Sequence, residues 1–183
     1  YKCVLESRET YKYEPGKVIG FTFGVSTSVK DTLGFNYESG VNEHKKARWG
    51  VRNSTDAYFF LLDGTELKLV KESTYPNNSV TITKDNFLDK LDGTGTSKAV
   101  IDYSKVTMYS IEYSWYGAIG ATFFVYLPVG NSKSRWVKIG EIPSSNVNFR
   151  PALSDPYMKM FLELEVPHRV KSPHFLKKYG TSV

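Results

Sequence analysis

The sequence has almost no cysteine: Cys3 is the single one among 183 residues. A lone thiol cannot close an internal disulfide, and it cannot supply a zinc site that needs several cysteines. A disulfide scaffold and a multi-cysteine zinc site are therefore excluded as sources of stability. A chain of this length hides roughly 70% of the surface that it exposes when unfolded, so a hydrophobic core can hold it together.

Long apolar runs are also missing. No segment approaches the roughly 20 residues that cross a bilayer, and residues 1–17 contain nothing like a signal peptide. We therefore expect a soluble protein with no membrane span. Because the chain starts at Tyr1 and not at Met, we also expect a processed product or part of a longer polypeptide.

A strong charge of one sign is absent as well. The net charge of +5 is modest, and it is weighted toward Lys45–Arg48 and a basic C-terminal stretch. Nucleic-acid-binding proteins carry a more concentrated basic footprint, and no recognition motif accompanies these residues. The sequence therefore favours protein partners over a nucleic-acid partner.

Motifs of catalysis and metal binding are scarce. Neither G-x-S-x-G nor G-x-x-x-x-G-K-[ST] occurs. The histidines are too widely spaced for the ligand pairs of zinc sites: His44, His168 and His174. Asp102 and Glu112 could form a carboxylate pair, but carboxylates on strands usually face solvent. We therefore expect no enzyme, with no catalytic, cofactor-binding or metal-binding residue and no cofactor.

Helical periodicity is rare, and alternation with period two takes its place, which is typical of strands. Residues 158–166 alternate between an apolar face and a second face that carries Lys159, Phe161, Glu163 and Glu165. Residues 106–115 alternate in the same way, with one face formed by Tyr109, Ile111, Tyr113 and Trp115. Shorter candidate strands are residues 17–25, 48–51, 57–62, 67–70, 79–83, 121–127 and 135–142.

Turn residues separate these strands. Asp63-Gly64 predicts a hairpin between residues 57–62 and 67–70, and Gly130-Asn131-Ser132 predicts another between residues 121–127 and 135–142. Thr83–Leu91 is the one plausible helix, and it is short. The pattern predicts an all-β fold, an antiparallel β-sandwich of jelly-roll-like type with one short helix. An open antiparallel sheet covered by that helix is the alternative.

The end of the chain differs in composition. Residues 167–183 contain two prolines, one glycine and few consecutive apolar residues, and their basic residues are Arg169, Lys171, Lys177 and Lys178. We therefore expect a β-sandwich domain over residues 1–166 and an extended C-terminal arm over residues 167–183. Such an arm would gain order on a neighbouring subunit.

Aromatic residues are abundant, with 13 Tyr, 11 Phe and 3 Trp. Most are needed for the core, but exposed rings could stack on sugar rings and so form a carbohydrate-binding surface. Asn53-Ser54-Thr55 and Asn77-Asn78-Ser79 also match the N-glycosylation sequon, which is short and often occurs by chance. A carbohydrate- or receptor-binding module therefore stays open as an alternative function.

Two blocks of sequence carry a family resemblance. The first runs from Arg48-Trp49-Gly50-Val51-Arg52 to Val70-Lys71-Glu72-Ser73 and contains Asp63-Gly64-Thr65-Glu66-Leu67. The second contains Asn86–Gly95, Ile101–Lys105, Ile111–Gly120 and Asn146–Met158. In this order, over about residues 40–166, they resemble virion structural proteins of tailed phages and large DNA viruses. That family carries an F-x-L-D-K-L-D-G-T-G-x-S-G block and an I-E-W-x-G-x-G turn.

The resemblance implies a non-enzymatic minor capsid, decoration or fibre-associated protein that is located in the virion and works by protein–protein assembly. Its partners would be other capsid or fibre subunits. In such a protein the motif residues would be architectural. We expect turns with unusual φ at Gly93, Gly95, Gly117 and Gly120, and we expect Trp115 and Tyr116 to wedge the sheets apart where strands reverse.

Overall fold

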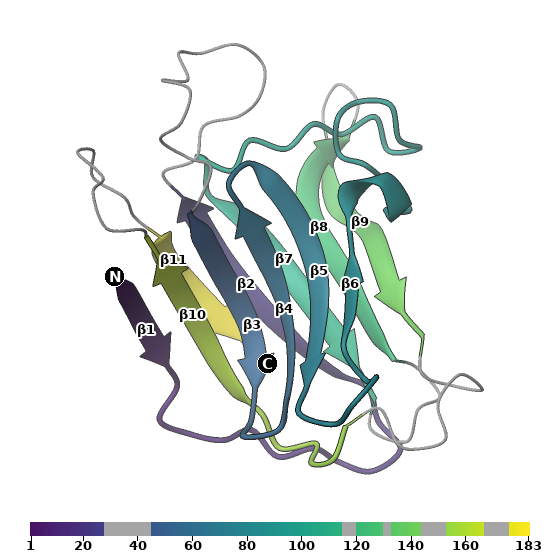
Figure 1. Cartoon of the computed structure of the whole chain (residues 1–183). Helices are drawn as coiled ribbons and strands as arrows, with labels where there is room; N and C mark the ends of the chain where they lie inside the picture. The colour runs from purple at the N-terminus through teal and green to yellow at the C-terminus, as the bar shows by residue number, and fades with distance from the viewer. Residues whose placement is uncertain (28–44, 115–119, 130–132, 144–152, 167–175) are drawn as a thin grey trace.

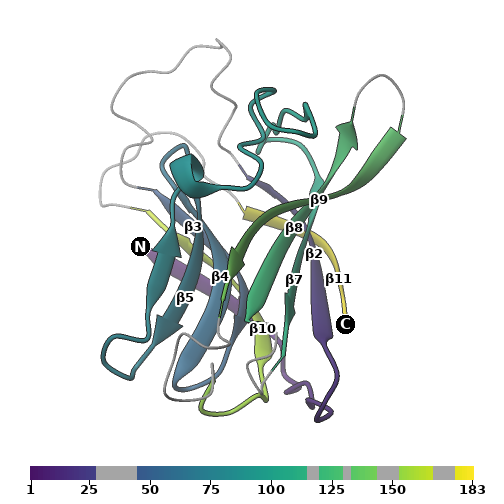
Figure 2. The ribbon, with the colours of Figure 1, turned by 90° about the vertical axis from the view of Figure 1, so that its right-hand side faces the viewer.

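A computed structural model of the chain describes residues 1–27, 45–114, 120–129, 133–143, 153–166 and 176–183. In these residues the fold is an antiparallel β-sandwich of two layers, seen face-on in Figure 1 and edge-on in Figure 2. The strands are β1 (Lys2–Glu6), β2 (Ile19–Thr27), β3 (Lys46–Arg52), β4 (Asp56–Asp63), β5 (Glu66–Ser73), β6 (Val80–Ile82), β7 (Thr107–Tyr113), β8 (Ala121–Val129), β9 (Lys133–Ile142), β10 (Lys159–Glu165) and β11 (Leu176–Ser182).

The two sheets combine local hairpins with strands from the chain ends. The first sheet has the order β1-β10-β3-β4-β5-β6, and the second has the order β11-β2-β7-β8-β9. The middle of the chain forms two meanders, β3 to β6 and β7 to β9, whereas both chain ends cross between the sheets. The predicted β-sandwich is therefore confirmed. Consecutive strands alternate between the two sheets, as they do in a jelly roll, only near the two ends of the described chain.

The largest side chains of the core between the sheets are aromatic. Trp49 on β3 and Phe60 on β4 meet Tyr109 of the facing sheet edge-to-face, with ring centroids 4.9 Å and 5.1 Å apart. In a second group, Tyr58 on β4 contacts Tyr113 of the facing sheet at 5.6 Å, and Phe21, from the same sheet as Tyr113, stacks on it at 6.0 Å. All of these rings are buried. Edge-to-face pairs add stabilisation beyond the apolar area that they bury, so these contacts join the two layers.

The outer face of the first sheet carries a second apolar cluster, formed by Ala57, Phe59, Val70 and Phe161 with Leu61 beside them. Its centre is Gly50, which pairs with Phe161 on one side and Phe59 on the other. Gly50 has no side chain, so the two flanking rings lie edge-to-face at 5.8 Å. A Cβ at position 50 would lie 2.2 Å from the carbonyl oxygen of Tyr58, which no real contact allows.

Most of the predicted strands are confirmed, and so is the Asp63-Gly64 hairpin. Asp63 pairs with Glu66, and Gly64 has φ 62° at the first central position of the two-residue turn, where glycine is favoured. Strands β8 and β9 pair as predicted, but the expected turn at 130–132 lies outside the described residues. The predicted strand 106–115 is shorter in the structure and ends at Tyr113.

The predicted helix is reduced to a single 3-10 turn, Lys84–Asn86, instead of reaching Leu91. The side chain of Asp89 accepts the backbone N–H of Leu91 at 3.1 Å and that of Ser97 at 2.8 Å. Leu91 itself has φ 55°. These bonds turn the backbone away from helical geometry, because Asp competes with the helix for nearby amides.

Both chain ends hold strands that the sequence did not predict. β1 pairs with β10, and β11 pairs with β2. Residues 176–182 of the predicted C-terminal arm therefore belong to the second sheet of the same chain, which corrects the expected boundary, whereas residues 167–175 lie outside the described residues. The reason is the same at both ends: an edge strand with mostly exposed side chains shows no apolar alternation.

Replacing Gly50 with alanine tests the close approach at the centre of the first sheet. The added Cβ meets backbone of β4, which cannot yield without displacing the strand, so we expect Gly50→Ala to lower the free energy of unfolding by about 3 kcal/mol. Gly180→Ala is the control, because nothing lies within 4 Å of a Cβ there. Denaturant unfolding measures both variants, and equal stability of the two would contradict the assignment.

Candidate functional site

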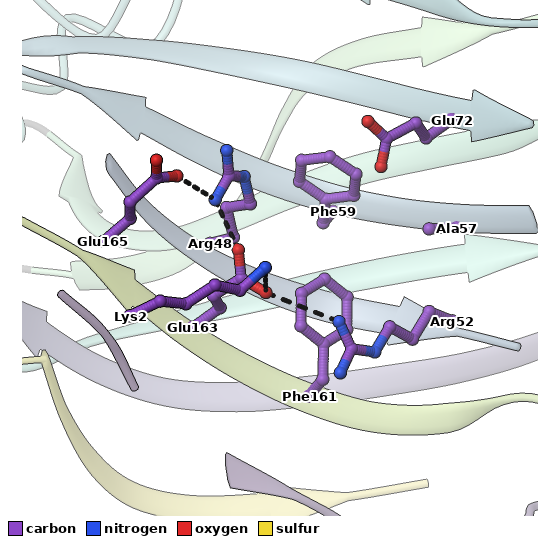
Figure 3. A pocket seen from close by; sticks show the side chains of 9 residues that line it. All are labelled: Lys2, Arg48, Arg52, Ala57, Phe59, Glu72, Phe161, Glu163 and Glu165. Carbon is purple, nitrogen blue, oxygen red and sulfur yellow. Dashed lines mark hydrogen bonds and ion pairs between the residues drawn. The ribbon is translucent and has the colours of Figure 1, made fainter. Parts of the chain in front are cut away.

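The outer face of the first sheet is hollowed into a shallow pocket of about 250 Å³. Figure 3 shows its side chains: Lys2, Arg48, Arg52, Ala57, Phe59, Glu72, Phe161, Glu163 and Glu165. They come from the neighbouring strands β1, β10, β3, β4 and β5, on the face turned away from the core. The floor is apolar, because Phe59 and Phe161 lie on it, and the rim is charged.

Glu163 organises the charged rim. Its side chain is only 4% exposed, and it forms ion pairs with Lys2 at 2.9 Å, with Arg48, and with Arg52 at 3.5 Å. Register explains this convergence, since Glu163 pairs with Arg48 across β3 and with Val4 across β1. A buried carboxylate needs such partners, because burial without them carries a large desolvation cost.

The remaining charges of the rim extend the same network. Arg48 also binds Glu165 at 3.0 Å, and Arg52 donates to Glu6 at 2.8 Å while its guanidinium lies 4.5 Å from the centre of the Phe161 ring. The hydrogen bond from Arg48 lowers the pKa of Glu165. The three basic and three acidic side chains that line the pocket cancel in formal charge, so the pocket is not a strong anion site.

The pocket corrects two expectations from the sequence. The sequence indicated a concentration of positive charge at Lys45–Arg48, but residues 46–48 lie in β3 and Arg48 is bound by glutamates. Alternation also placed Phe161 and Glu163 on the face opposite the apolar one, whereas both are buried. Phe161 was the signal in the sequence that this face is buried, because a large ring facing water is unusual in a half-buried strand.

A second polar cluster surrounds Asp56, which is buried at one end of the sandwich. Asp56 accepts the backbone N–H of Ser154 at 2.8 Å and the hydroxyl groups of Ser73 at 2.7 Å and Thr55 at 3.1 Å. Asn53 completes the cluster by donating from its side-chain nitrogen to the carbonyl oxygen of Asp155 at 2.7 Å. These bonds join the segment before β10 to the β3–β4 turn.

Electrostatics at this end of the sandwich follow from burial. Burial alone would raise the pKa of Asp56, but the hydrogen bonds from Ser154, Ser73 and Thr55 outweigh it and hold the pKa below its ordinary value. Burial lowers the pKa of Lys71, although nearby Asp56 opposes this shift. Lys71 donates to the side-chain oxygen of Asn78 at 2.7 Å. The cluster is thus a satisfied structural network.

The D-K-L-D-G-T-G block forms a loop folded around the buried carboxylate of Asp89, which accepts the two amides described above. Gly95 packs against that carboxylate, because a Cβ there would lie 2.3 Å from its Oδ1. Asp92 accepts the backbone N–H of Thr94 at 3.0 Å, and Gly93 has φ 85°. The unusual φ expected at Gly93 is therefore confirmed.

For the other described glycines of the family motifs, the structural reason for glycine is not the one expected. Gly95 and Gly120 do not have positive φ; each is required by close approach, since a Cβ on Gly120 would lie 1.7 Å from the carbonyl oxygen of Ile142. The residues expected to wedge the sheets, together with Gly117, lie outside the described residues: Trp115 and Tyr116.

The outer face of the second sheet carries a row of exposed apolar side chains. Gly24, Met108, Tyr126 and Trp136 pair with one another in turn across β2, β7, β8 and β9. The rings of Tyr126 and Trp136 meet at 5.3 Å, and they are 38% and 40% exposed. Tyr179 on β11 packs beside Gly24, so the row continues to the edge of the sheet. We call the side chains of Met108, Tyr126, Trp136 and Tyr179 the aromatic row.

The two candidate acids, Asp102 and Glu112, are not brought together. Asp102 accepts the backbone N–H of Ser104 in the turn before β7, whereas Glu112 lies near the other end of that strand. The three histidines lie outside the described residues. In the described part of the chain, no three His, Cys, Asp or Glu side chains gather as a metal site.

Comparisons with known proteins add no assignment: no family model, no curated protein and no solved structure matches this chain. The described residues also contain no helix that is long and apolar enough to cross a membrane.

The Asp56 cluster predicts an acid-dependent loss of stability. Because the folded-state pKa of Asp56 lies below its unfolded value, the stabilisation is fully present above about pH 4 and is lost as pH falls through the folded-state pKa. At neutral pH we expect Asp56→Asn to cost about 2–3 kcal/mol, with a difference from wild type that narrows toward acid. Denaturant unfolding over a pH series measures this. Glu72→Gln, at an exposed carboxylate, is the control, and a pH-independent difference for Asp56→Asn would contradict the prediction.

Proposed function

We propose that the protein is a non-enzymatic viral structural protein, a minor capsid, decoration or fibre-type module that works by protein–protein assembly in the virion. One observation carries the proposal: the residues that resemble the virion family are used for architecture. Asp89 and Gly95 shape one loop, and Gly50 allows the close approach at the centre of the first sheet. A module with this role needs a rigid scaffold, and motif residues that shape the backbone are consistent with that need.

The charged side chains also support a structural role. Lys2, Arg48 and Arg52 of the first sheet are bound by neighbouring glutamates, which reduces the free positive charge there that could hold nucleic acid. Assembly would then depend on edge strands and exposed side chains outside this network, and the partners would be other capsid or fibre subunits.

Locating the chain in purified particles tests this role. We expect mass spectrometry of density-purified virions to detect the chain at a fixed ratio to the major capsid protein, and electron cryo-microscopy to place the two-layered sandwich on the particle. A non-structural protein from the same infected cells serves as the contamination control. A chain that is abundant in infected cells and depleted from particles to the level of that control would contradict the proposal.

The aromatic row favours a second candidate, a carbohydrate- or receptor-binding module. Tyr126 and Trp136 offer ring faces on a sheet surface, and Lys138, which forms an ion pair with Glu141, lies two residues along β9 from Trp136. Rings that stack on sugar C–H groups next to an amine donor would suit a saccharide. Such binding could operate on a particle, so the two candidates are compatible.

A glycan array tests the aromatic row. We expect specific binding that Trp136→Ala weakens at least tenfold, because the variant removes the larger exposed ring of the pair. Tyr75→Ala is the matched control, since Tyr75 is an equally exposed aromatic residue in the β5–β6 turn, outside the row. No binding across the array, or equal losses for the two variants, would remove this candidate.

A further inference from the structure

The backbone of β1 presents one unpaired edge among the described residues, since β1 is the outermost strand of the first sheet (Figure 1). Tyr1 and Val166 exchange both backbone hydrogen bonds, and the N–H of Ser7 donates to Met160. Antiparallel ladders alternate, so Cys3 and Leu5 also point their amides toward β10. The N–H and C=O groups of Lys2, Val4 and Glu6 therefore point outward.

The side chains of β1 are exposed to solvent, as is the outward edge of its backbone. All five residues are exposed, including Val4 at 43% and Leu5 at 56%. An edge strand with free amides and uncovered apolar side chains readily pairs with another strand unless charge or proline blocks it. β1 has no proline, and its two charges lie at opposite ends with opposite signs.

We propose that β1 pairs antiparallel with β1 of a second copy of this chain, about a two-fold axis at Val4. In this register Val4 lies opposite the partner's Val4, and Lys2 lies opposite the partner's Glu6. Each of these is a hydrogen-bonded pair, so every outward amide of Lys2, Val4 and Glu6 is used. Leu5 lies opposite the partner's Cys3, which covers its apolar side chain. The two first sheets would become one continuous sheet.

Charge complementarity selects this register and this partner. Lys2 already binds Glu163, and Glu6 already accepts from Arg52, yet both side chains stay partly exposed. Opposite charges directly across a strand pair stabilise it, and like charges destabilise it. Lys2 and the partner's Glu6 would therefore join the ion-pair networks of the two copies.

The other sheet edges fit a second copy less well. β6 has only three residues, β11 contains a bulge between Lys178 and Gly180, and β9 begins with four exposed residues of which two are basic, Lys133 and Arg135. β9 also has opposite charges near its ends, Lys133 and Glu141, but its pairing with β8 shifts register between Lys138 and Gly140, whereas β1 pairs with β10 without a shift. The inference rests on the proposed assembly function and names one of its partners.

Charge exchange tests the pairing by sedimentation velocity over a concentration series. We expect a dimer for the unaltered chain, and a dissociation constant raised at least about tenfold for Lys2→Glu and for Glu6→Lys alone, because each places like charges opposite one another. Mixing the two variants should restore a dimer, since each position then meets its opposite charge. Monomers for the unaltered chain at every concentration, or no recovery in the mixture, would overturn the proposal.

Disulfide trapping tests the register. Cys3 and the partner's residue 5 form a non-hydrogen-bonded pair with Cα atoms about 4.5 Å apart, within the range of about 4.4–6.8 Å that disulfides use. Leu5→Cys should therefore yield an oxidised dimer, whereas the unaltered chain and the double variant Cys3→Ser, Leu5→Cys should not. An oxidised dimer of the unaltered chain would overturn this register, because it would place Cys3 opposite itself.

Val4→Pro separates pairing from folding. Proline at this position removes an outward N–H and none of the bonds to β10, so the variant should keep the unfolding midpoint of the unaltered chain and be monomeric. Undiminished dimerisation of Val4→Pro would count against β1 as the contact. Failure of all these tests would refute self-pairing alone, because the presence of the chain in purified virions is measured separately.

Discussion

The first sheet is buried on both of its faces at β3, and the rest of the structure depends on this double burial. Gly50 lies at the point where it happens, between Trp49 and Val51, whose side chains are fully buried toward the second sheet. On the other face, Phe59 and Phe161 close over the glycine. Two layers of side chains therefore share one strand, and the glycine lets β3 and β4 approach closely enough to support both.

The ion-pair network is a consequence of that arrangement. Once Phe161 is buried on the outer face, Glu163 of the same strand is drawn into the same low-dielectric surface, where it needs cationic partners. Arg48 and Arg52 lie two positions on either side of Gly50 and supply them. The formal charges that line this outer surface therefore cancel within the sheet, and the edge of β1 and the aromatic row lie outside that network.

The sequence could predict the central strands because their two faces differ in polarity. β7 and β10 alternate clearly, and the Asp63-Gly64 turn has the chemistry of a tight hairpin. β1 and β11 could not be recognised in this way, since edge strands bury few side chains and so carry little pattern. The pocket was equally hidden, because Lys2, Arg48 and Glu163 meet only through strand register. Register joins residues more than a hundred positions apart, and a single sequence does not encode it in any local signal.

One bond described above bears on how the protein can be produced. The side-chain nitrogen of Asn53, the atom to which an N-linked glycan would be attached, already donates to the backbone of Asp155. A sugar added there during secretion would keep the segment before β10 from docking on the β3–β4 turn. Asn77, in contrast, is exposed in a turn with φ 60°. In a glycosylating pathway a sugar at Asn77 would therefore extend from an exposed turn, whereas a sugar at Asn53 would compete with the bond that helps join the segment before β10 to the β3–β4 turn.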